Sequence, residues 1–167
     1  MRRAPRRRPP APVEPGRPYR VLLVCSSGGH LAQLEQLRPW WSSLERTWVC
    51  PPTDDVRSTL VGEDVVEGHH PTTRHLPNLV RNALLAVRTL RRVRPDVVVS
   101  DGAGLAVPFF WAARAAGVRT AYLEVYDRVD GPTLTTRLVR PVCDLLMVQW
   151  PAQQSALPGS VLAGPVL

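Results

Sequence analysis

Short apolar runs alternate with amphipathic stretches along most of the chain. The run at 19–25 (YRVLLVC) leads into a Ser-Ser-Gly-Gly turn, which is typical of a buried parallel strand entering a glycine loop. Apolar residues then recur at 31, 34 and 37 with helical spacing, and Pro39 is expected to end this helix. Further strands are expected at 47–50, 64–68, 95–100, 119–126, 143–150 and 160–167.

The segment 76–94 has the clearest helical periodicity. Its apolar residues recur at positions i, i+3, i+4 and i+7, and they are Leu79, Val80, Ala83, Leu84, Val87 and Leu90. Shorter helices are expected at 56–62 and 133–141. Another helix is expected to start near Pro108 and to stop at Gly117.

Strands that alternate with helices at this spacing imply βαβ units and a parallel sheet. Because crossovers in such units are right-handed, the simplest topology is a Rossmann-like, doubly wound α/β fold. Such sheets bind ligands at the carboxyl ends of their strands, where every glycine loop of this sequence is expected to lie. The sequence therefore predicts a single α/β domain over residues 19–167.

The charge of the chain is concentrated near its N-terminus. The formal net charge is +7, and residues 1–20 contribute seven arginines and one acid to it, so the rest is nearly neutral. Residues 1–18 are rich in Arg and Pro and are expected to form a disordered basic tail. The tail is either a segment attracted to anionic lipid headgroups or nucleic acid, or a solubilising leader, or the product of a start codon assigned too early. Specific nucleic-acid binding is not expected of the near-neutral domain.

The cysteines and the apolar runs bear on the compartment. Cys25, Cys50 and Cys143 are odd in number and form no C-x-x-C pair, which favours reduced, buried thiols in a cytoplasmic protein. No apolar stretch approaches the roughly 20 residues that a transmembrane helix needs.

The glycine loop after the first strand is a candidate phosphate site. Ser27, Gly28 and Gly29 precede a helix, whose first N–H groups are free and carry partial positive charge. His30 has a side chain that titrates near neutral pH, so it is either a general base or a hydrogen-bonding partner of an acceptor phosphate. A simple structural turn with a solvent-facing histidine is equally compatible with this short motif.

Two more strand ends carry candidate chemistry. Asp101, Gly102 and Gly104 follow a buried strand, either as a loop that closes around substrate with Asp101 holding a hydroxyl, or as an ordinary Asp-Gly turn. Glu124 ends another apolar strand and is, with His30, a candidate catalytic residue, and Arg128, a candidate substrate contact, follows within four residues. A charged cluster at the carboxyl end of a strand favours a functional role in this architecture.

Arginines also recur along the segment 76–94. Arg81, Arg88 and Arg92 fall within a narrow stripe at helical spacing. The stripe is either a solvated face or a basic surface that contacts phosphates at a membrane.

The second half of the chain carries the most specific pattern. The stretches DVVVSDGAGLAVPFF, YLEVYDRVDGPTLTTRLVRPVCDLLMVQWP and GPVL, together with the early SSGGH, resemble the membrane-anchor subunit family of the split UDP-N-acetylglucosaminyltransferase of lipid-linked oligosaccharide synthesis, including bacterial capsule and exopolysaccharide subunits. The resemblance covers about residues 19–167. It implies the fold of the N-terminal half of a GT-B glycosyltransferase.

The resemblance also implies a function. The chain would be the acceptor-binding, membrane-recruiting subunit of a two-chain glycosyltransferase, with a separate nucleotide-sugar-binding subunit as its partner. The pair would transfer GlcNAc or a related hexose from a UDP-sugar to a polyprenyl-diphosphate-linked glycan, without a metal or other cofactor. The location implied is cytoplasmic and peripheral, on the inner face of the cell membrane.

Carried over by motif, the resemblance assigns roles to residues. Gly28, Gly29 and His30 would face the acceptor diphosphate or its reacting hydroxyl. The loop at 101–104 would line the cleft, with Glu124 and Arg128 beside it, whereas 149–151 (QWP) would serve structure or partner contact.

Two features qualify the resemblance. Eukaryotic members of the family carry an N-terminal transmembrane anchor where this sequence has an Arg/Pro tail. The sequence stops at Leu167, where a fused enzyme would continue into its second half, which favours the split arrangement. The main alternative is a noncatalytic scaffold that only recruits the catalytic partner. A nicotinamide-dependent oxidoreductase is disfavoured because no G-x-G-x-x-G fingerprint follows the first strand.

Overall fold

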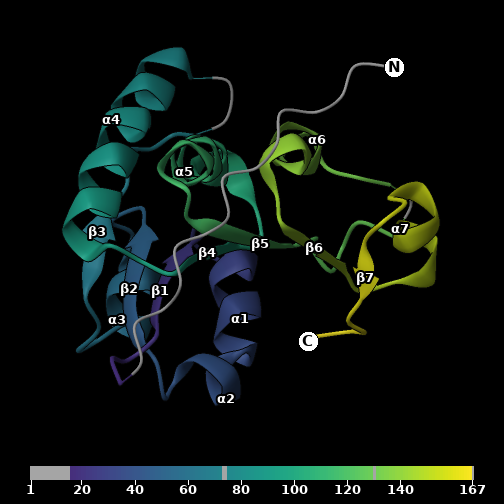
Figure 1. Cartoon of the computed structure of the whole chain (residues 1–167), viewed down its shortest axis with the longest axis horizontal. Helices are drawn as coiled ribbons and strands as arrows, with labels where there is room; N and C mark the ends of the chain where they lie inside the picture. Colours follow the sequence, from purple (N-terminus) through teal and green to yellow (C-terminus); the bar gives the residue numbers. More distant parts are fainter. Residues whose placement is uncertain (1–15, 73–74, 130, 167) are drawn as a thin grey trace.

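A computed structural model describes residues 16–72, 75–129 and 131–166 of the chain. Within them, seven strands form one parallel sheet in the order β3-β2-β1-β4-β5-β6-β7 (Figure 1). The chain builds outward from β1 to β3 and then returns to add β4 to β7 on the other side, so the predicted doubly wound α/β fold is confirmed. The strands are β1 (Arg20–Val24), β2 (Glu45–Cys50), β3 (Val65–Glu67), β4 (Val97–Ser100), β5 (Arg119–Leu123), β6 (Leu145–Val148) and β7 (Val161–Leu162).

Helices cover both faces of the sheet. Helices α4, α5 and α6 pack on one face, and α1, α2 and α3 pack on the other (Figure 1). The described helices are α1 (Gly29–Gln36), α2 (Arg38–Trp41), α3 (Asp54–Thr59), α4 (Leu76–Val93), α5 (Ala103–Ala116), α6 (Leu134–Val139), the 3-10 turn η1 (Arg140–Val142) and α7 (Pro151–Ala156).

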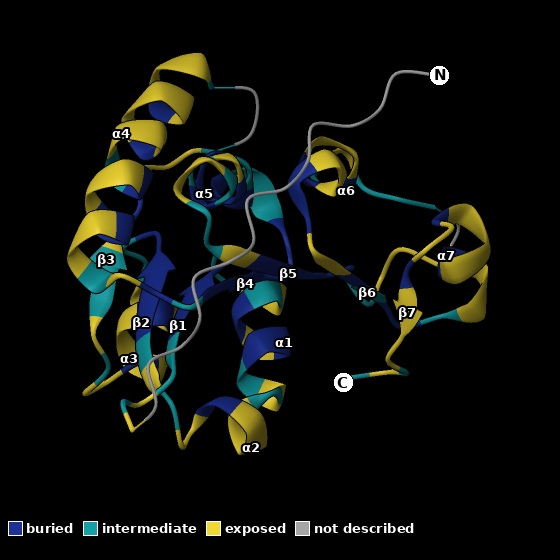
Figure 2. Ribbon diagram, viewed as in Figure 1, coloured by how far each residue is buried: buried dark blue, intermediate teal, exposed yellow. Residues whose placement is uncertain are grey.

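The strand pleat divides the core between these two layers. Leu22 and Val24 of β1 point toward α5, whereas Val21 and Leu23 point toward α1 and α2. All four are completely buried, as the central strand of a parallel sheet requires (Figure 2). This packing fixes the positions at which the strands end, and the candidate loops begin there.

Some predicted boundaries are wrong. Helix α5 begins at Ala103, five residues before Pro108, because Gly102 turns the chain directly from β4 into the helix. Pro108 lies inside α5, where the burial of Phe109 and Phe110 offsets the one hydrogen bond that a proline cannot donate.

The remaining differences concern prolines and the C-terminal end. Helices α2 and α7 were not predicted, and each has a proline, Pro39 or Pro151, in its first two positions, where no helical N–H bond is lost. The final strand is only two residues long, although a longer run at 160–167 was expected.

The tail and the thiols complete the picture of the domain. Most of the expected tail, residues 1–15, lies outside the described residues, but Arg17 already contacts Asp96 at the start of β4, just before the predicted domain boundary. Cys25, Cys50 and Cys143 are free and buried, as predicted. None of the helices in the described ranges is long and apolar enough to cross a membrane.

Candidate functional site at the carboxyl edge of the sheet

The site is built where β1, β4 and β5 end. These strands are neighbours in the sheet, so the loops that follow them meet at one edge. The loop after β1 leads to Gly29 and α1, the loop after β4 holds Asp101 and Gly102, and the loop after β5 runs from Glu124 to α6. The sheet therefore brings together three of the segments that the sequence singled out.

The glycine loop is held open toward solvent. Gly28 has a φ of 68°, in the left-handed region that favours glycine, and helix α1 begins at the next residue. The N–H of Gly28 donates a hydrogen bond to Asp55 Oδ2 at 2.8 Å. Bonds from the Thr53 side chain and from this N–H lower the pKa of Asp55 below its usual range. Sequence reasoning missed this role of Asp55, which depends on a contact between residues 27 positions apart.

His30 and Asp101 form the ionisable pair of the site. His30 Nδ1 lies 3.2 Å from Asp101 Oδ2, and the Asp101 side chain is completely buried. Burial raises the pKa of Asp101 to about 6, although His30 opposes the rise. Burial alone would lower the pKa of His30, but the contact with Asp101 outweighs it and raises that pKa above its ordinary value. Asp101 was expected to hold a substrate hydroxyl, and the structure instead places its carboxylate behind the imidazole.

The two glycines after Asp101 have different surroundings. Gly102 has a φ of 140°, and a Cβ there would lie 2.7 Å from His30 Cε1. Glycine at this position therefore lets the imidazole pack against the backbone. A Cβ on Gly104 would lie 2.5 Å from the carbonyl oxygen of Thr72, so Gly104 permits the contact between α5 and the loop before α4. Gly104 was expected to line the cleft, but it borders neither hollow described below.

Glu124 is buried beneath the loop that follows β5. Its carboxylate accepts hydrogen bonds from the hydroxyls of Thr136 at 2.5 Å and Thr133 at 3.3 Å, and from the backbone N–H groups of Val125 and Thr133. The side chain is completely inaccessible to solvent. The sequence interpretation made Glu124 a catalytic group, and these contacts instead favour a role in positioning the loop and the start of α6.

Three buried glutamines connect the site to the C-terminal end of the domain. Gln149 Nε2 donates to Gln33 Oε1 at 3.0 Å, and Gln153 Nε2 donates to the carbonyl oxygens of Val125 and Arg128. Gln149, in the expected QWP signature, therefore has a structural role. Gln33 and Gln153 were missed, although a glutamine on the buried face of a short helix is a signal that points to such a network.

Two hollows flank His30. One of about 340 Å³ is lined by Gly29, His30, Gln33 and residues 125–127. The other has a volume of about 230 Å³. It is lined by His30, Gly102, Ala103, Tyr122, Val125, Asp127, Arg128, Thr133 and Thr135. The structure thus brings Gly29, His30, Gly102 and Arg128 together around open space. Ser27 is half-buried and borders neither hollow.

No group of three or more His, Cys, Asp or Glu side chains within the described ranges is arranged to hold a metal ion. The groups present at this edge are an imidazole backed by a carboxylate, the amides at the start of α1 and an exposed arginine.

Comparison with known proteins decides the family. The family model described as "Oligosaccharide biosynthesis protein Alg14 like" matches residues 67–166. The chain belongs to the Alg14 family. The "UDP-N-acetylglucosamine transferase subunit ALG14" of Mus musculus is 24% identical over 95% of this chain and 88% of its own. The human protein of the same name is 25% identical over 93% and 86%.

Solved structures with a similar fold belong to proteins that are longer than this Alg14-family chain. MurG from Acinetobacter baumannii superposes with a TM-score of 0.69 at 19% identity, over 89% of this chain and 46% of the MurG chain. The UDP-GlcNAc 2-epimerase of Methanocaldococcus jannaschii gives a TM-score of 0.65 at 13% identity, over 83% and 41%. The chain therefore spans less than half of these proteins. The predicted relation to one half of a GT-B fold is confirmed at the level of fold.

The basic helix of the Alg14-family chain has an unusual orientation. Helix α4 buries Asn78, Asn82 and Thr89, and it exposes apolar side chains to solvent (Figure 2). The buried amides are satisfied, since Asn82 exchanges two hydrogen bonds with the backbone of His69. The exposed apolar residues are Leu76, Leu79, Val80, Leu84 and Val87. We call these five residues the apolar face of α4.

The arginines of α4 do not act as one group. Arg92 lies 3.6 Å from Asp64, and Arg81 donates a weak hydrogen bond to Asn78 at 3.3 Å. Arg88 and Arg91 have no ion pair among the described residues and flank the apolar face. Arg92 was expected to contact lipid phosphates, but its position beside Asp64 turns it toward the opposite edge of the sheet.

Proposed function

We propose that this chain is the acceptor-side subunit of a two-chain glycosyltransferase. Its partner would be a separate nucleotide-sugar-binding subunit, and the pair would transfer GlcNAc or a related hexose from a UDP-sugar to a polyprenyl-diphosphate-linked glycan. The observation that carries the proposal is the His30–Asp101 pair, which lies between two hollows at the carboxyl edge of half a GT-B fold. The names of the relatives support the donor and the pathway class.

His30 is the general base of the proposed reaction. Asp101 faces Nδ1, which leaves Nε2 to accept the proton of the acceptor hydroxyl. The hydroxyl oxygen then attacks the anomeric carbon of the donor sugar, and the bond to UDP breaks as the new glycosidic bond forms. Buried Asp101 stabilises the imidazolium that results. Attack from the face opposite the leaving group inverts the anomeric configuration.

The glycine loop is the proposed contact for the acceptor diphosphate. Gly29 and His30 are the first residues of α1, where backbone N–H groups have no partner within the helix, and both line the larger hollow. Arg128 is exposed at the rim of the smaller hollow and supplies positive charge there. The exposed Asp55 carboxylate already occupies the N–H of Gly28, which leaves the following amides for a phosphate.

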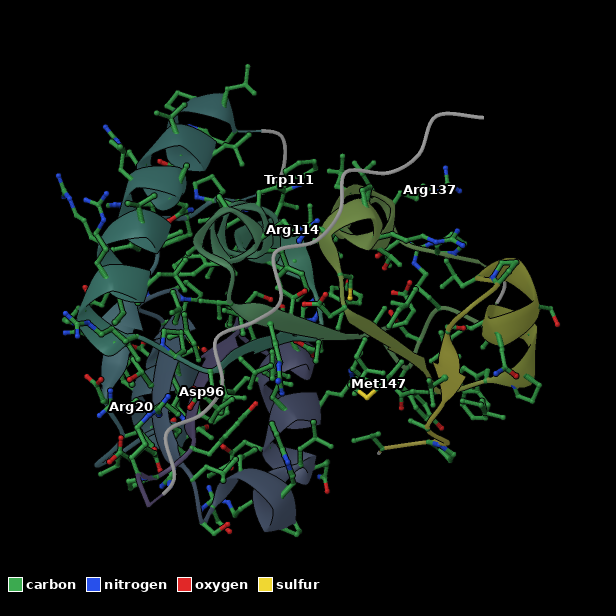
Figure 3. The ribbon with its side chains drawn as sticks, in the orientation of Figure 1. Arg20, Asp96, Trp111, Arg114, Arg137 and Met147 are labelled. Carbon is green, nitrogen blue, oxygen red and sulfur yellow. The ribbon has the colours of Figure 1, made fainter. Side chains whose placement is uncertain are left out.

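The apolar face of α4 is the proposed membrane contact. Val80 is 60% exposed and Leu76 is 73% exposed, and large apolar side chains gathered on one face in this way mark interaction surfaces. Trp111 of α5 and Leu134 of α6 extend the exposed apolar surface on the same side of the sheet, and Arg114 and Arg137 lie beside them (Figure 3). Cations around an apolar surface match a bilayer with anionic headgroups.

This surface lies beside the site because of the topology. A helix that follows a parallel strand starts at the carboxyl edge of the sheet, so Leu76 and Leu134, at the first positions of α4 and α6, flank that edge. A membrane-bound acceptor would then reach His30 without leaving the bilayer surface. The proposed location is accordingly peripheral, on the cytoplasmic face of the cell membrane.

Reconstitution tests the proposal. The purified chain is mixed with the nucleotide-sugar-binding subunit, and transfer from radiolabelled UDP-GlcNAc to a polyprenyl-diphosphate-linked sugar is followed. We expect transfer from the pair and none from either chain alone. His30→Ala should lower kcat about 100-fold or more while the complex stays intact by gel filtration.

Two results would decide against parts of the proposal. Full turnover by this chain alone would reject the division of the site between two subunits. Unchanged kcat in His30→Ala would reject a base in this subunit and leave a scaffold that only recruits the catalytic partner. His69→Ala is the matched control, because His69 is exposed in the loop before α4 and borders neither hollow.

A further inference from the structure

Tyr122 carries a buried hydroxyl without a partner. The side chain is completely buried in β5, and its ring packs edge-on against Phe110 with the centroids 5.8 Å apart. Its hydroxyl makes no hydrogen bond of acceptable geometry with the described residues, although the hydroxyls of Thr133 and Thr136 lie near enough to lower its pKa. Buried hydroxyls in native proteins nearly always have a partner, so an unpartnered one calls for an explanation.

The neighbouring His30–Asp101 pair also has polar atoms without hydrogen bonds of acceptable geometry. His30 Nδ1 and both carboxylate oxygens of Asp101 are buried without a geometrically acceptable hydrogen bond. A Cβ on Gly102 would lie 3.2 Å from the Tyr122 hydroxyl and 2.7 Å from His30 Cε1, so the phenol and the imidazole approach the same glycine. Tyr122, His30 and Gly102 all line the hollow of about 230 Å³.

The size and lining of this hollow limit its ligand. Pockets for drug-sized ligands begin at about 300 Å³, so the hollow accommodates a single sugar ring and is too small for a nucleotide sugar. Thr133, Thr135 and Arg128 also border it. The Thr133 hydroxyl already donates to Glu124, so the polar groups left for a ligand are the Thr135 hydroxyl and the Arg128 guanidinium, which match a polyhydroxylated ring with a nearby anionic group.

We propose that this hollow binds the acceptor sugar and that the Tyr122 hydroxyl donates a hydrogen bond to an oxygen next to the reacting hydroxyl. This inference rests on the proposed function and names the residue that orients the acceptor ring toward His30. Burial raises the pKa of Tyr122, so its hydroxyl stays protonated and is a donor throughout the working pH range. Tyr122 is thus a binding and orienting residue and takes no part in proton transfer.

Sequence reasoning passed over Tyr122 because it lies in an apolar strand. The signal was its spacing of two from Glu124, which places both side chains on the same face of β5. A tyrosine is a candidate for contact with ligand when it lies two residues before a carboxylate at the end of a strand and a glycine loop approaches the same face.

Tyr122→Phe is the direct test, because it removes one oxygen and keeps the ring against Phe110. In the reconstituted pair we expect kcat/KM for an acceptor probe, GlcNAc linked through diphosphate to a farnesyl chain, to fall about tenfold or more. KM for the UDP-sugar should stay the same, and the melting temperature should not fall. Tyr19→Phe is the matched control, since Tyr19 precedes β1 at the opposite edge of the sheet, and it should change none of these values.

Acceptor analogues that each lack one sugar oxygen give a sharper readout. For one analogue, kcat/KM of the wild-type pair should be about tenfold lower than for the full acceptor, because the oxygen that Tyr122 contacts is missing. The Tyr122→Phe pair should show the same kcat/KM for this analogue and for the full acceptor. If every analogue instead lowers kcat/KM by the same factor in both proteins, Tyr122 does not touch the acceptor. Unchanged acceptor kinetics in Tyr122→Phe would equally overturn the proposal, since an ordered water would then account for the free hydroxyl.

Binding by the isolated subunit separates this inference from the proposed function. The dissociation constant of the same probe, GlcNAc linked through diphosphate to a farnesyl chain, is measured by isothermal titration without the partner or donor. Weaker binding in Tyr122→Phe, together with wild-type binding in Tyr19→Phe, supports the sugar site even if the pair transfers nothing. Equal binding by Tyr122→Phe and wild type rejects the sugar site even if the pair is active.

Discussion

At the scale of single residues, the site depends on two buried carboxylates with different environments. Asp101 lies beside His30 and makes no hydrogen bond of acceptable geometry with the described residues, and burial raises its pKa to about 6. Glu124 has four hydrogen-bond donors from a loop and a helix start. The first carboxylate is suited to support a proton transfer, and the second to hold a backbone in place.

The His30–Asp101 pair predicts a pH dependence. His30 accepts a proton only when it is neutral, and contact with Asp101 raises its pKa, so kcat/KM should fall as pH drops through a value above 6.5. Asp101→Asn removes the carboxylate that favours the imidazolium, so the acidic limb should move to lower pH while the plateau falls about tenfold or more. Steady-state rates between pH 5 and 9 measure both effects. An acidic limb at the same pH in both proteins would argue against the pair.

Glu124→Gln separates positioning from catalysis. A glutamine amide turns at least one donor toward the N–H and hydroxyl donors that now bind the carboxylate, so we expect a loss of about 2 kcal/mol or more in unfolding free energy. For a domain of this size that corresponds to a fall of roughly 4–8 °C in melting temperature. Glu67→Gln is the control, because Glu67 is largely exposed at the end of β3. If Glu124→Gln instead keeps the wild-type melting temperature and loses activity, the result supports a catalytic role for Glu124.

At the scale of elements, α4 shows that periodicity predicts a helix without fixing which face is buried. The apolar spacing in 76–94 predicted its extent almost to the residue. Yet Asn78 and Asn82 face inward, because the loop before α4 offers the carbonyl oxygens of Pro71 and His69 to their amide N–H groups. Those acceptors lie in an irregular segment whose path no local pattern encodes.

The apolar face of α4 predicts a change in membrane affinity. Leu84→Glu should weaken binding to vesicles of anionic phosphatidylglycerol about tenfold or more, because it removes apolar contact and adds a repelled charge. The melting temperature should not change, since Leu84 is exposed. Val61→Glu makes the same chemical change at an exposed residue of the turn after α3, and it should bind vesicles like wild type. Co-sedimentation checks the difference, and equal binding by the two variants would remove α4 as the contact.

The strands were the easiest elements to predict, and the site was the hardest. Runs such as 97–100 are apolar throughout because both faces of a parallel sheet are covered. The contacts of Asp101 with His30 and of Gly28 with Asp55 join residues far apart in sequence, and only the strand order brings them together. The residue types were therefore predictable, whereas their pairing and the buried state of Asp101 were not.

At the scale of the whole molecule, positive charge is concentrated in the first fifteen residues of the sequence. Residues 1–15 carry five arginines and one glutamate, whereas Arg17 and Arg20 pair with Asp96 and Glu45 in the domain. Removing residues 1–15 should weaken binding to anionic vesicles at low salt and have little effect at 0.5 M salt, because salt screens the attraction between the arginines and the anionic headgroups. Melting temperature and vesicle binding, measured for both chain lengths, check this, and identical salt profiles would exclude a role for the tail.

The strand order also governs how the nascent chain matures. Strand β1 lies between β2 and β4, and β4 starts 73 residues after β1 ends, at Val97 and Val24 respectively. At about 5–20 residues per second, one edge of β1 stays open for roughly 4–15 s of synthesis. Such an edge pairs readily with other chains. A chaperone that binds exposed strand edges is therefore expected to act on this chain mainly before β4 is synthesised and covers β1.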